Sequence, residues 1–136
     1  MFHFLSRFSF QKIKTSLQSN SRKEAYQIGL EAEKNAEILL KQMGFKILAQ
    51  RFKTKMGEID LLAANKKLLI AVEVKKRKTL EEGQLSLRPR QCKRLQNALN
   101  IAITLNPEWM RENIRFDMFA FDDQGNYCHV PNILQD

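Results

Sequence analysis

Residues 57–75 read GEIDLLAANKKLLIAVEVK, and this stretch decides the fold. Its second half contains a continuous apolar run, residues 68–72, and such a run bounded by charged residues predicts a strand buried on both faces. That strand ends in charge, with Glu73 and Lys75 two positions apart, and its upstream neighbour carries Asp60 just before its own apolar run. Because side chains alternate along a strand, we expect Glu73 and Lys75 on the same side of the sheet.

The two apolar runs are separated by residues 65–67, Asn-Lys-Lys, which is short enough for a β-hairpin. A two-residue turn at the Lys pair places Asp60 opposite Glu73 and Glu58 opposite Lys75. Like charges on neighbouring strands are unfavourable unless something compensates them. A bound divalent cation would do so, and a small set of oxygen ligands suits Mg²⁺ or Mn²⁺ better than zinc.

A purely structural interpretation of the same residues stays open. In it, Glu58 and Lys75 form an ordinary cross-strand ion pair, and Asp60 and Glu73 lie at a solvated strand end. Three features favour the metal interpretation: the order of Asp, Glu and Lys, the basic character of the chain, and a further carboxylate on an upstream helix.

The motifs GEIDLLA (57–63), VEVKKR (72–77) and RFD (115–117) resemble the YraN-type family of small, largely uncharacterised bacterial proteins. Members of that family are predicted endonucleases of the PD-(D/E)xK superfamily. The resemblance covers approximately residues 25–121. The chain departs from the family pattern at Arg51, where Asn is usual, at Ala32, where Gly is common, and in its additional first twenty residues.

The resemblance implies a restriction-endonuclease-like fold and a site for Mg²⁺ or Mn²⁺. By the same resemblance, Asp60, Glu73 and the backbone carbonyl of Val74 would bind the ion, and Lys75 would act on the attacking water. It further places Glu33 at the helix carboxylate that completes the site or holds a second ion. Glu58 would steady Lys75 from outside the ligand set, whereas Asp117 of RFD is expected to be structural.

The net charge of +8 is concentrated around the hairpin, because residues 51–94 hold thirteen basic and five acidic side chains. An excess of positive charge beside the carboxylates is what a polyanion-binding surface needs, although a merely solvated basic surface is the alternative. Three groups of basic residues are candidates for contacting the phosphate backbone of a nucleic acid. They are Arg51, Lys53 and Lys55 before Gly57, Lys76 and Arg77 after the strand, and Arg90, Lys93 and Arg94 at the start of a helix.

The length of 136 residues predicts one domain with its own core. Residues 1–20 are expected to form a basic, aromatic extension, with a membrane-surface anchor as the less favoured alternative, and residues 21–136 the nuclease-like domain. No apolar segment is long enough for an integral membrane span. Cys92 and Cys128 lie far apart without a metal-binding motif, so reduced thiols and a cytoplasmic location are expected.

Helical spacing predicts a first helix over residues 22–43 after a polar break at 19–21, and Pro89 begins a second one. Strands are expected at 45–49, 59–64, 68–75, 114–121 and 127–130, and a mobile loop at 79–84. The order α-β-β-β-α-β-β predicts an α/β domain with a mixed sheet flanked by helices.

The function expected from these features is metal-dependent hydrolysis of phosphodiester bonds in DNA, with structured or branched DNA among the candidate substrates. The sequence itself does not decide between DNA and RNA, or between a monomer and a homodimer. Two alternatives stay open: a nucleic-acid-binding module without catalysis, and a basic interaction protein that docks on an acidic partner.

Overall fold

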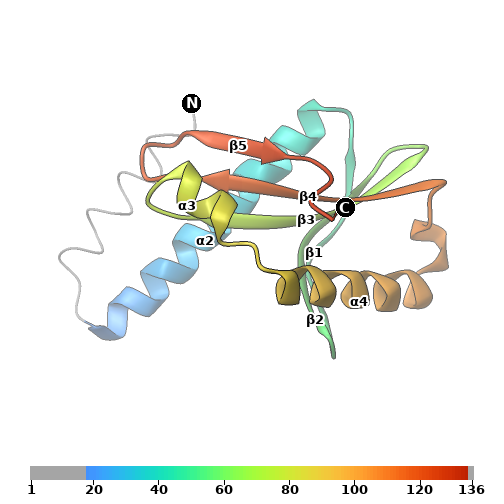
Figure 1. Ribbon diagram of the computed structural model, residues 1–136, viewed down its shortest axis with the longest axis horizontal. Coiled ribbons are helices and arrows are strands. Elements are labelled where there is room, and N and C mark those ends of the chain that lie inside the picture. The colour runs from blue at the N-terminus through green and yellow to red at the C-terminus, as the bar shows by residue number, and fades with distance from the viewer. Residues whose placement is uncertain (1–17, 135–136) are drawn as a thin grey trace.

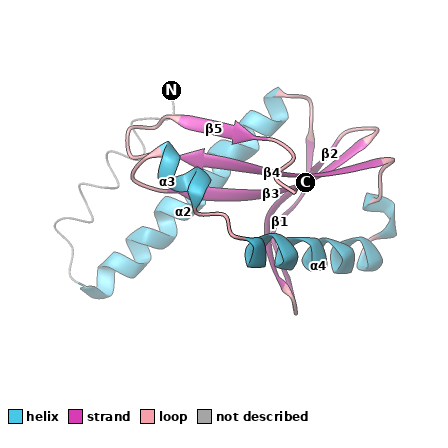
Figure 2. Ribbon diagram, in the orientation of Figure 1, coloured by secondary structure: helices cyan, strands magenta, loops and turns pink. Residues whose placement is uncertain are grey.

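The computed structural model describes residues 18–134, and these form a five-stranded mixed sheet with helices on both faces (Figure 1). The strands lie in the order β1-β2-β3-β4-β5. The elements are α2 (Gln18–Gln42), β1 (Lys46–Thr54), β2 (Gly57–Ala64), β3 (Leu68–Lys76), α3 (Leu80–Leu85), α4 (Pro89–Leu105), the 3₁₀ turn η1 (Pro107–Trp109), β4 (Asn113–Phe121) and β5 (Tyr127–Val130). The predicted α/β fold is confirmed, with α3 and η1 as short additions (Figure 2).

The hairpin of β2 and β3 has the predicted register, with Leu61 opposite Val72 and Ala64 opposite Leu69. The Asn65 side chain shapes the turn, since its Oδ1 accepts the backbone N–H groups of Lys67 and Leu68 at 3.0 and 2.8 Å. An Asn side chain can hold a tight turn in this way without the glycine that such turns favour. The register therefore places Asp60 and Glu73 one step beyond the last paired positions.

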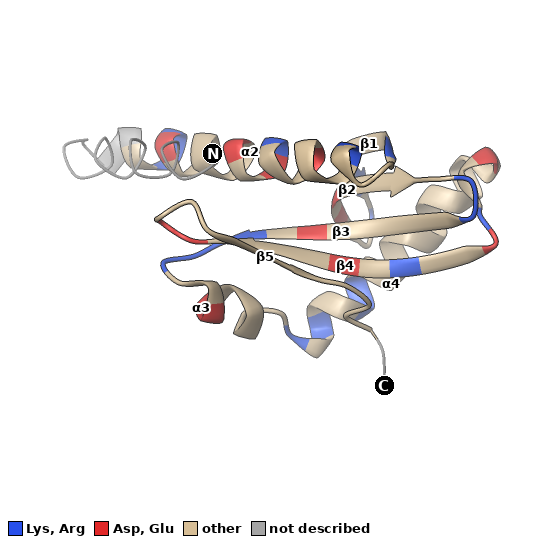
Figure 3. Cartoon of the chain, turned by 90° about the horizontal axis from the view of Figure 1, so that it is seen from above, with Lys and Arg blue, Asp and Glu red and all other residues tan. Residues whose placement is uncertain are grey.

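Strand β3 is buried on both faces, as its apolar sequence predicts. It pairs antiparallel with β2 and parallel with β4. Its residues Ile70 and Val72 belong to the core that packs against α2, while Leu69 and Ala71 belong to the core that packs against α4. Figure 3 shows the two layers, with α2 on one side of the sheet and α3 and α4 on the other.

Helix α2 begins earlier than predicted, at Gln18, and runs through the polar residues 19–21 without a break. Ser and Asn lower helix stability by only about 0.7 kcal/mol or less each, which a 25-residue helix absorbs. Its buried side includes the polar Asn35, whereas Met43, just after the helix, is 48% exposed. Of the predicted extension 1–20, residues 1–17 lie outside the part of the chain that the structure describes.

The segment predicted as a mobile loop contains the helix α3. Thr79 caps its N-terminus, and the Thr79 side chain accepts the N–H of Glu82 at 3.1 Å. The T-x-x-E spacing is a helix-start signal, and the prediction of a loop overlooked it. Gly83 lets α3 approach β4 closely, since a Cβ there would lie 2.9 Å from Ala120 Cβ.

Asp117 is completely buried in β4 and holds the C-terminal part of the fold together, in agreement with the predicted structural role. Its carboxylate accepts two hydrogen bonds from Arg115, each 2.8 Å, one from the Asn132 backbone at 3.0 Å, and contacts His129 Nε2 at 2.8 Å. Burial alone would raise the pKa of Asp117, but these partners together lower it below its usual value. The Asp117 carboxylate is therefore ionised, and it connects Arg115, His129 and the backbone of Asn132.

Replacement of Asp117 by Asn is expected to lower the free energy of unfolding by about 3 kcal/mol, because it leaves the partly buried Arg115 without its ionic partner. Urea denaturation at pH 7 measures the change. Asp123→Asn is the matched control, since the Asp123 side chain is 23% exposed, against 0% for Asp117, and its replacement should cost less than about 1 kcal/mol. Equal losses of unfolding free energy in the two variants would contradict the structural role of Asp117.

Candidate metal centre

The candidate centre lies where β2 and β3 separate after Leu61 and Val72. Asp60 is the first residue beyond this pairing, and its Oδ2 accepts the backbone N–H of Val74 at 2.8 Å. The Asp60 side chain thus connects β2 to β3 where the backbone hydrogen bonds between the two strands end. The result is that Asp60 lies against the segment that carries Glu73 and Lys75.

Asp60 lies close enough to Glu73 for the Glu73 charge to act strongly on it. Burial, together with the neighbouring charge of Glu73 and a smaller effect of Glu33, raises the pKa of Asp60 to about 8, against the opposing hydrogen bond from Val74. A carboxyl group in this state is protonated at neutral pH unless a cation replaces the proton. As predicted, an acidic side chain on the adjoining strand therefore destabilises the charged form of Asp60 unless a cation or a proton compensates the charge.

Lys75 lies beside this acidic pair. Its Nζ is 3.2 Å from Glu73 Oε2, and only 10% of its side chain is exposed. The two residues lie on the same side of β3, as the alternation of side chains predicts. An ammonium group held this far from bulk water, next to the Glu73 carboxylate, is suited to interact with whatever that carboxylate binds.

Glu58 does not face Lys75, so the predicted cross-strand pair is wrong. The pairing of β2 with β3 ends at Leu61, and the rest of β2 pairs only with β1, where Glu58 lies opposite Lys53. Glu58 is exposed. Its place is at the mouth of the site, and the ionic partner of Lys75 is Glu73.

Glu33, on α2, lies near enough to Asp60 for its charge to contribute to the raised pKa of Asp60. Both of its oxygens, however, accept hydrogen bonds from Arg51, at 2.9 and 3.0 Å. Arg51 adopts a left-handed backbone conformation, with φ of 47°, and its guanidinium lies 4.8 Å from the centre of the Tyr26 ring. The Arg51 side chain is thus engaged within the protein and is not simply one of the exposed cations that precede Gly57.

The residues present fit a hard divalent cation. Asp60 on β2 and Glu73 and the Val74 carbonyl on β3 are oxygen donors, which is the donor type that Mg²⁺ and Mn²⁺ prefer. Within residues 18–134, no three His, Cys, Asp or Glu side chains come together as a ready-made metal cluster. The centre is thus a two-carboxylate site, and its further ligands would be the backbone carbonyl and water.

A cavity of about 110 Å³ opens beside Glu73, at the start of α4. Sequence reasoning missed Gln91, which lines it one turn before Arg94, and Cys92, whose pKa is raised by burial and by the charge of Glu73. Both cysteines are free thiols, as predicted. The residues that line the cavity are Gly57, Glu58, Glu73, Gln91, Arg94 and Leu95.

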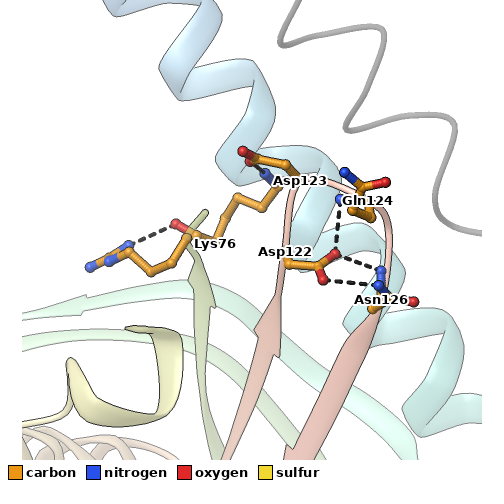
Figure 4. Close-up of polar contacts among 6 residues, drawn as sticks. Lys76, Asp122, Asp123, Gln124 and Asn126 are labelled. Atoms are coloured by element: carbon orange, nitrogen blue, oxygen red, sulfur yellow. Dashed lines mark hydrogen bonds and ion pairs between the residues drawn. The ribbon is translucent and has the colours of Figure 1, made fainter. Parts of the chain in front are cut away.

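The remaining predicted basic residues differ in their availability. Lys76 Nζ lies 2.7 Å from Asp123 Oδ1, on the turn that the Asp122 side chain organises by accepting the N–H groups of Gln124 and Asn126 (Figure 4). Six others are exposed, and the basic positions at the start of α4 are visible in Figure 3. These six are Lys53, Lys55, Arg77, Arg90, Lys93 and Arg94.

The mixed sheet, the helices on its two faces and the acidic strand ends define an α/β domain consistent with the restriction-endonuclease-like fold. The chain belongs to the uncharacterised protein family UPF0102, whose family model matches residues 32–121. This match includes Glu33, Asp60, Glu73 and Lys75. It agrees with the predicted YraN-type family.

Curated relatives extend this assignment over most of the chain. A UPF0102 protein of Rhodopseudomonas palustris (strain BisB5) is 42% identical over 110 residues, which are 81% of this chain and 84% of the relative. One of Granulibacter bethesdensis is 44% identical over 107 residues, or 79% and 68% of the two chains. One of Chelativorans sp. is 37% identical over 113 residues, or 83% and 91%. Among the described helices, none has the length and apolarity to cross a membrane.

Proposed function

We propose that this protein is a nuclease that hydrolyses phosphodiester bonds in DNA with the help of Mg²⁺ or Mn²⁺. The observation that carries the proposal is the burial of Asp60 beside Glu73, with the Lys75 ammonium 3.2 Å from Glu73. A carboxyl group whose pKa is strongly raised by burial and a neighbouring charge, beside a second carboxylate and an amine, is typical of a functional site. The resemblance of GEID and EVK to PD-(D/E)xK nucleases points to the same chemistry.

Each residue of the centre has a defined task in this proposal. Asp60, Glu73 and the Val74 carbonyl hold the ion, which when bound polarises a phosphoryl oxygen and lowers the pKa of a water molecule. Lys75 donates a hydrogen bond to the oxygen of the attacking water, which orients it and stabilises the hydroxide that forms as its proton passes to bulk water. Glu58, at the mouth of the cavity, adds negative charge that favours cation entry over anion entry.

The exposed cations supply the surface for the polyanionic substrate. Arg90, Lys93 and Arg94 lie on the first turns of α4, and Arg94 lines the cavity that contains Glu73. Arg77 is exposed just after β3, and its Nη1 donates to the Lys76 carbonyl at 2.8 Å. Contacts of this kind to phosphates fix the position of a strand without reading its sequence. The free thiols of Cys92 and Cys128 are what a protein that acts in the reducing cytoplasm would carry.

Cleavage of a panel of single-stranded, duplex, flap and branched DNA tests the proposal. Wild-type protein should cut at least one substrate with Mg²⁺ or Mn²⁺ and none with EDTA. Glu73→Gln should reduce the rate at least about 100-fold, because it removes a ligand charge, while affinity for the DNA in a gel-shift assay stays within a few-fold.

The charge-matched control is Glu112→Gln, an exposed acid just before β4 and outside the centre, which should cleave like the wild type. The opposite result for the wild type, DNA binding without cleavage of any substrate, would favour the non-catalytic binding module. Failure of both binding and cleavage would favour the interaction protein that docks on an acidic partner.

A further inference from the structure

The pair formed by Glu33 and Arg51 bears on how many ions the centre takes. The guanidinium covers both carboxylate oxygens, with Nε to Oε1 at 2.9 Å and Nη2 to Oε2 at 3.0 Å. The exposed fractions of the two side chains are 29% and 15%, so the pair is partly shielded from water. A two-point contact of this geometry is among the strongest hydrogen-bonded ion pairs in proteins.

The backbone is arranged to bring Arg51 to Glu33. Arg51 lies between the paired positions Gln50–Leu61 and Phe52–Ile59, so it is across the β1–β2 ladder from Asp60. Its φ of 47° is a left-handed conformation, which costs a side-chain-bearing residue about 1–2 kcal/mol. The contact with the Tyr26 ring at 4.8 Å supports the guanidinium from its other side. A strained, doubly supported arginine is fixed in place rather than freely mobile.

The balance of charges around the centre then suits one divalent ion, because two of the three carboxylates already have a basic partner. Glu33 is matched by Arg51, and Glu73 is contacted by Lys75. Asp60 accepts the Val74 amide N–H, has no basic side-chain partner among the described residues, and is affected by the charges of both Glu73 and Glu33. A second divalent ion at Glu33 would have to displace the guanidinium from both carboxylate oxygens, and it would be repelled by that positive charge.

We propose that the centre binds a single divalent ion, and that the Arg51 guanidinium occupies the position at Glu33 where a second ion would otherwise bind. This inference rests on the proposed function. It assigns Arg51 to the centre itself instead of to the surface that contacts the nucleic-acid backbone. It also gives Glu33 the task of holding this built-in cation in place.

Counting bound Mn²⁺ tests the inference without any activity assay. Titration of the folded protein, followed by calorimetry and by the loss of the free-Mn²⁺ signal in electron paramagnetic resonance, should give one ion per wild-type chain. Arg51→Gly removes the guanidinium while glycine accepts the left-handed backbone, so this variant should fold and bind two ions. The double variant Arg51→Gly with Glu33→Gln should return to one.

Lys53→Ala is the matched control, because it removes an exposed cation two positions along β1 without touching Glu33, and it should leave one ion per chain. Two ions in the wild type, or one ion in Arg51→Gly, would overturn the inference and leave the proposed nuclease standing. No bound ion in the wild type would instead remove the proposed function itself. The outcomes of the two proposals are therefore distinguishable.

Discussion

The replacement of Asp60 by Asn is expected to stabilise the metal-free protein at pH 8 by about 3–5 kcal/mol, while it abolishes binding of the divalent ion. Asn matches the shape of a protonated Asp. Its carbonyl oxygen can accept the Val74 N–H, as Asp60 does at 2.8 Å, and its amide group can donate to Glu73. The variant thus keeps the hydrogen bonds and removes the buried charge.

The sign of the effect follows from the pKa of Asp60, which burial and Glu73 raise from 3.8 to about 8 in the folded protein. Between these values, the folded state holds a proton that the unfolded chain releases. The free energy of unfolding of the wild type therefore falls as the pH rises through this window, by up to about 1.4 kcal/mol per pH unit. Below the lower value both states are protonated, and the advantage of the Asn variant disappears.

Urea denaturation in EDTA at several pH values between 4 and 8 measures this difference. Saturating Mg²⁺ at pH 8 should stabilise the wild type, because the ion binds the folded state only, and should leave the variant unchanged. Glu58→Gln is the matched control, since it removes the same charge from an exposed position on the same strand and should stay within about 0.5 kcal/mol. A wild-type stability that is flat from pH 5 to pH 8 would mean that Asp60 and Glu73 are not forced together.

The core of this centre could be predicted because it depends on local patterns. Two apolar runs and a three-residue spacer fix the hairpin register, and Asn65 supplies the turn chemistry within the same segment. The register in turn determines that Asp60 and Glu73 meet. By contrast, where β2 leaves β3 depends on the twist of the whole sheet and on its pairing with β1, so the partner of Glu58 could not be read from spacing.

The contacts that modify the centre are long-range and escaped prediction for that reason. Arg51 meets Glu33 from 18 positions away, and Lys76 meets Asp123 from 47 positions away. Both basic residues look like surface cations in the sequence, because alternation and charge say nothing about how helices and turns dock on the sheet. Only the docking of α2 shows that the Arg51 side chain is held by Glu33, and for this reason we propose a place for it in the centre instead of a contact with substrate.

Replacement of Lys75 by Met is expected to lower the rate of DNA cleavage by about 100- to 10,000-fold while the protein still binds its ion, since proton transfer aided by a positioned side chain contributes this much. Met has a similar length and an apolar character that suits a side chain with 10% exposure, so the fold should persist. Without the ammonium 3.2 Å away, Glu73 has lost its ionic partner. Metal-free Lys75→Met should thus be less stable than the wild type, and it should gain more from Mg²⁺.

Comparison of single-turnover cleavage with Mn²⁺ affinity separates these two consequences in one variant. The expected result is an ion bound at least as tightly as in the wild type, together with a loss of the chemical step, and Lys75→Arg should recover part of that step because it restores a positive donor. Lys78→Met is the matched control, an exposed lysine three positions along that should cleave normally. If Lys75→Met cleaved like the wild type, the ammonium would serve only to neutralise Glu73, because a group that acts on the attacking water cannot be removed without slowing the reaction.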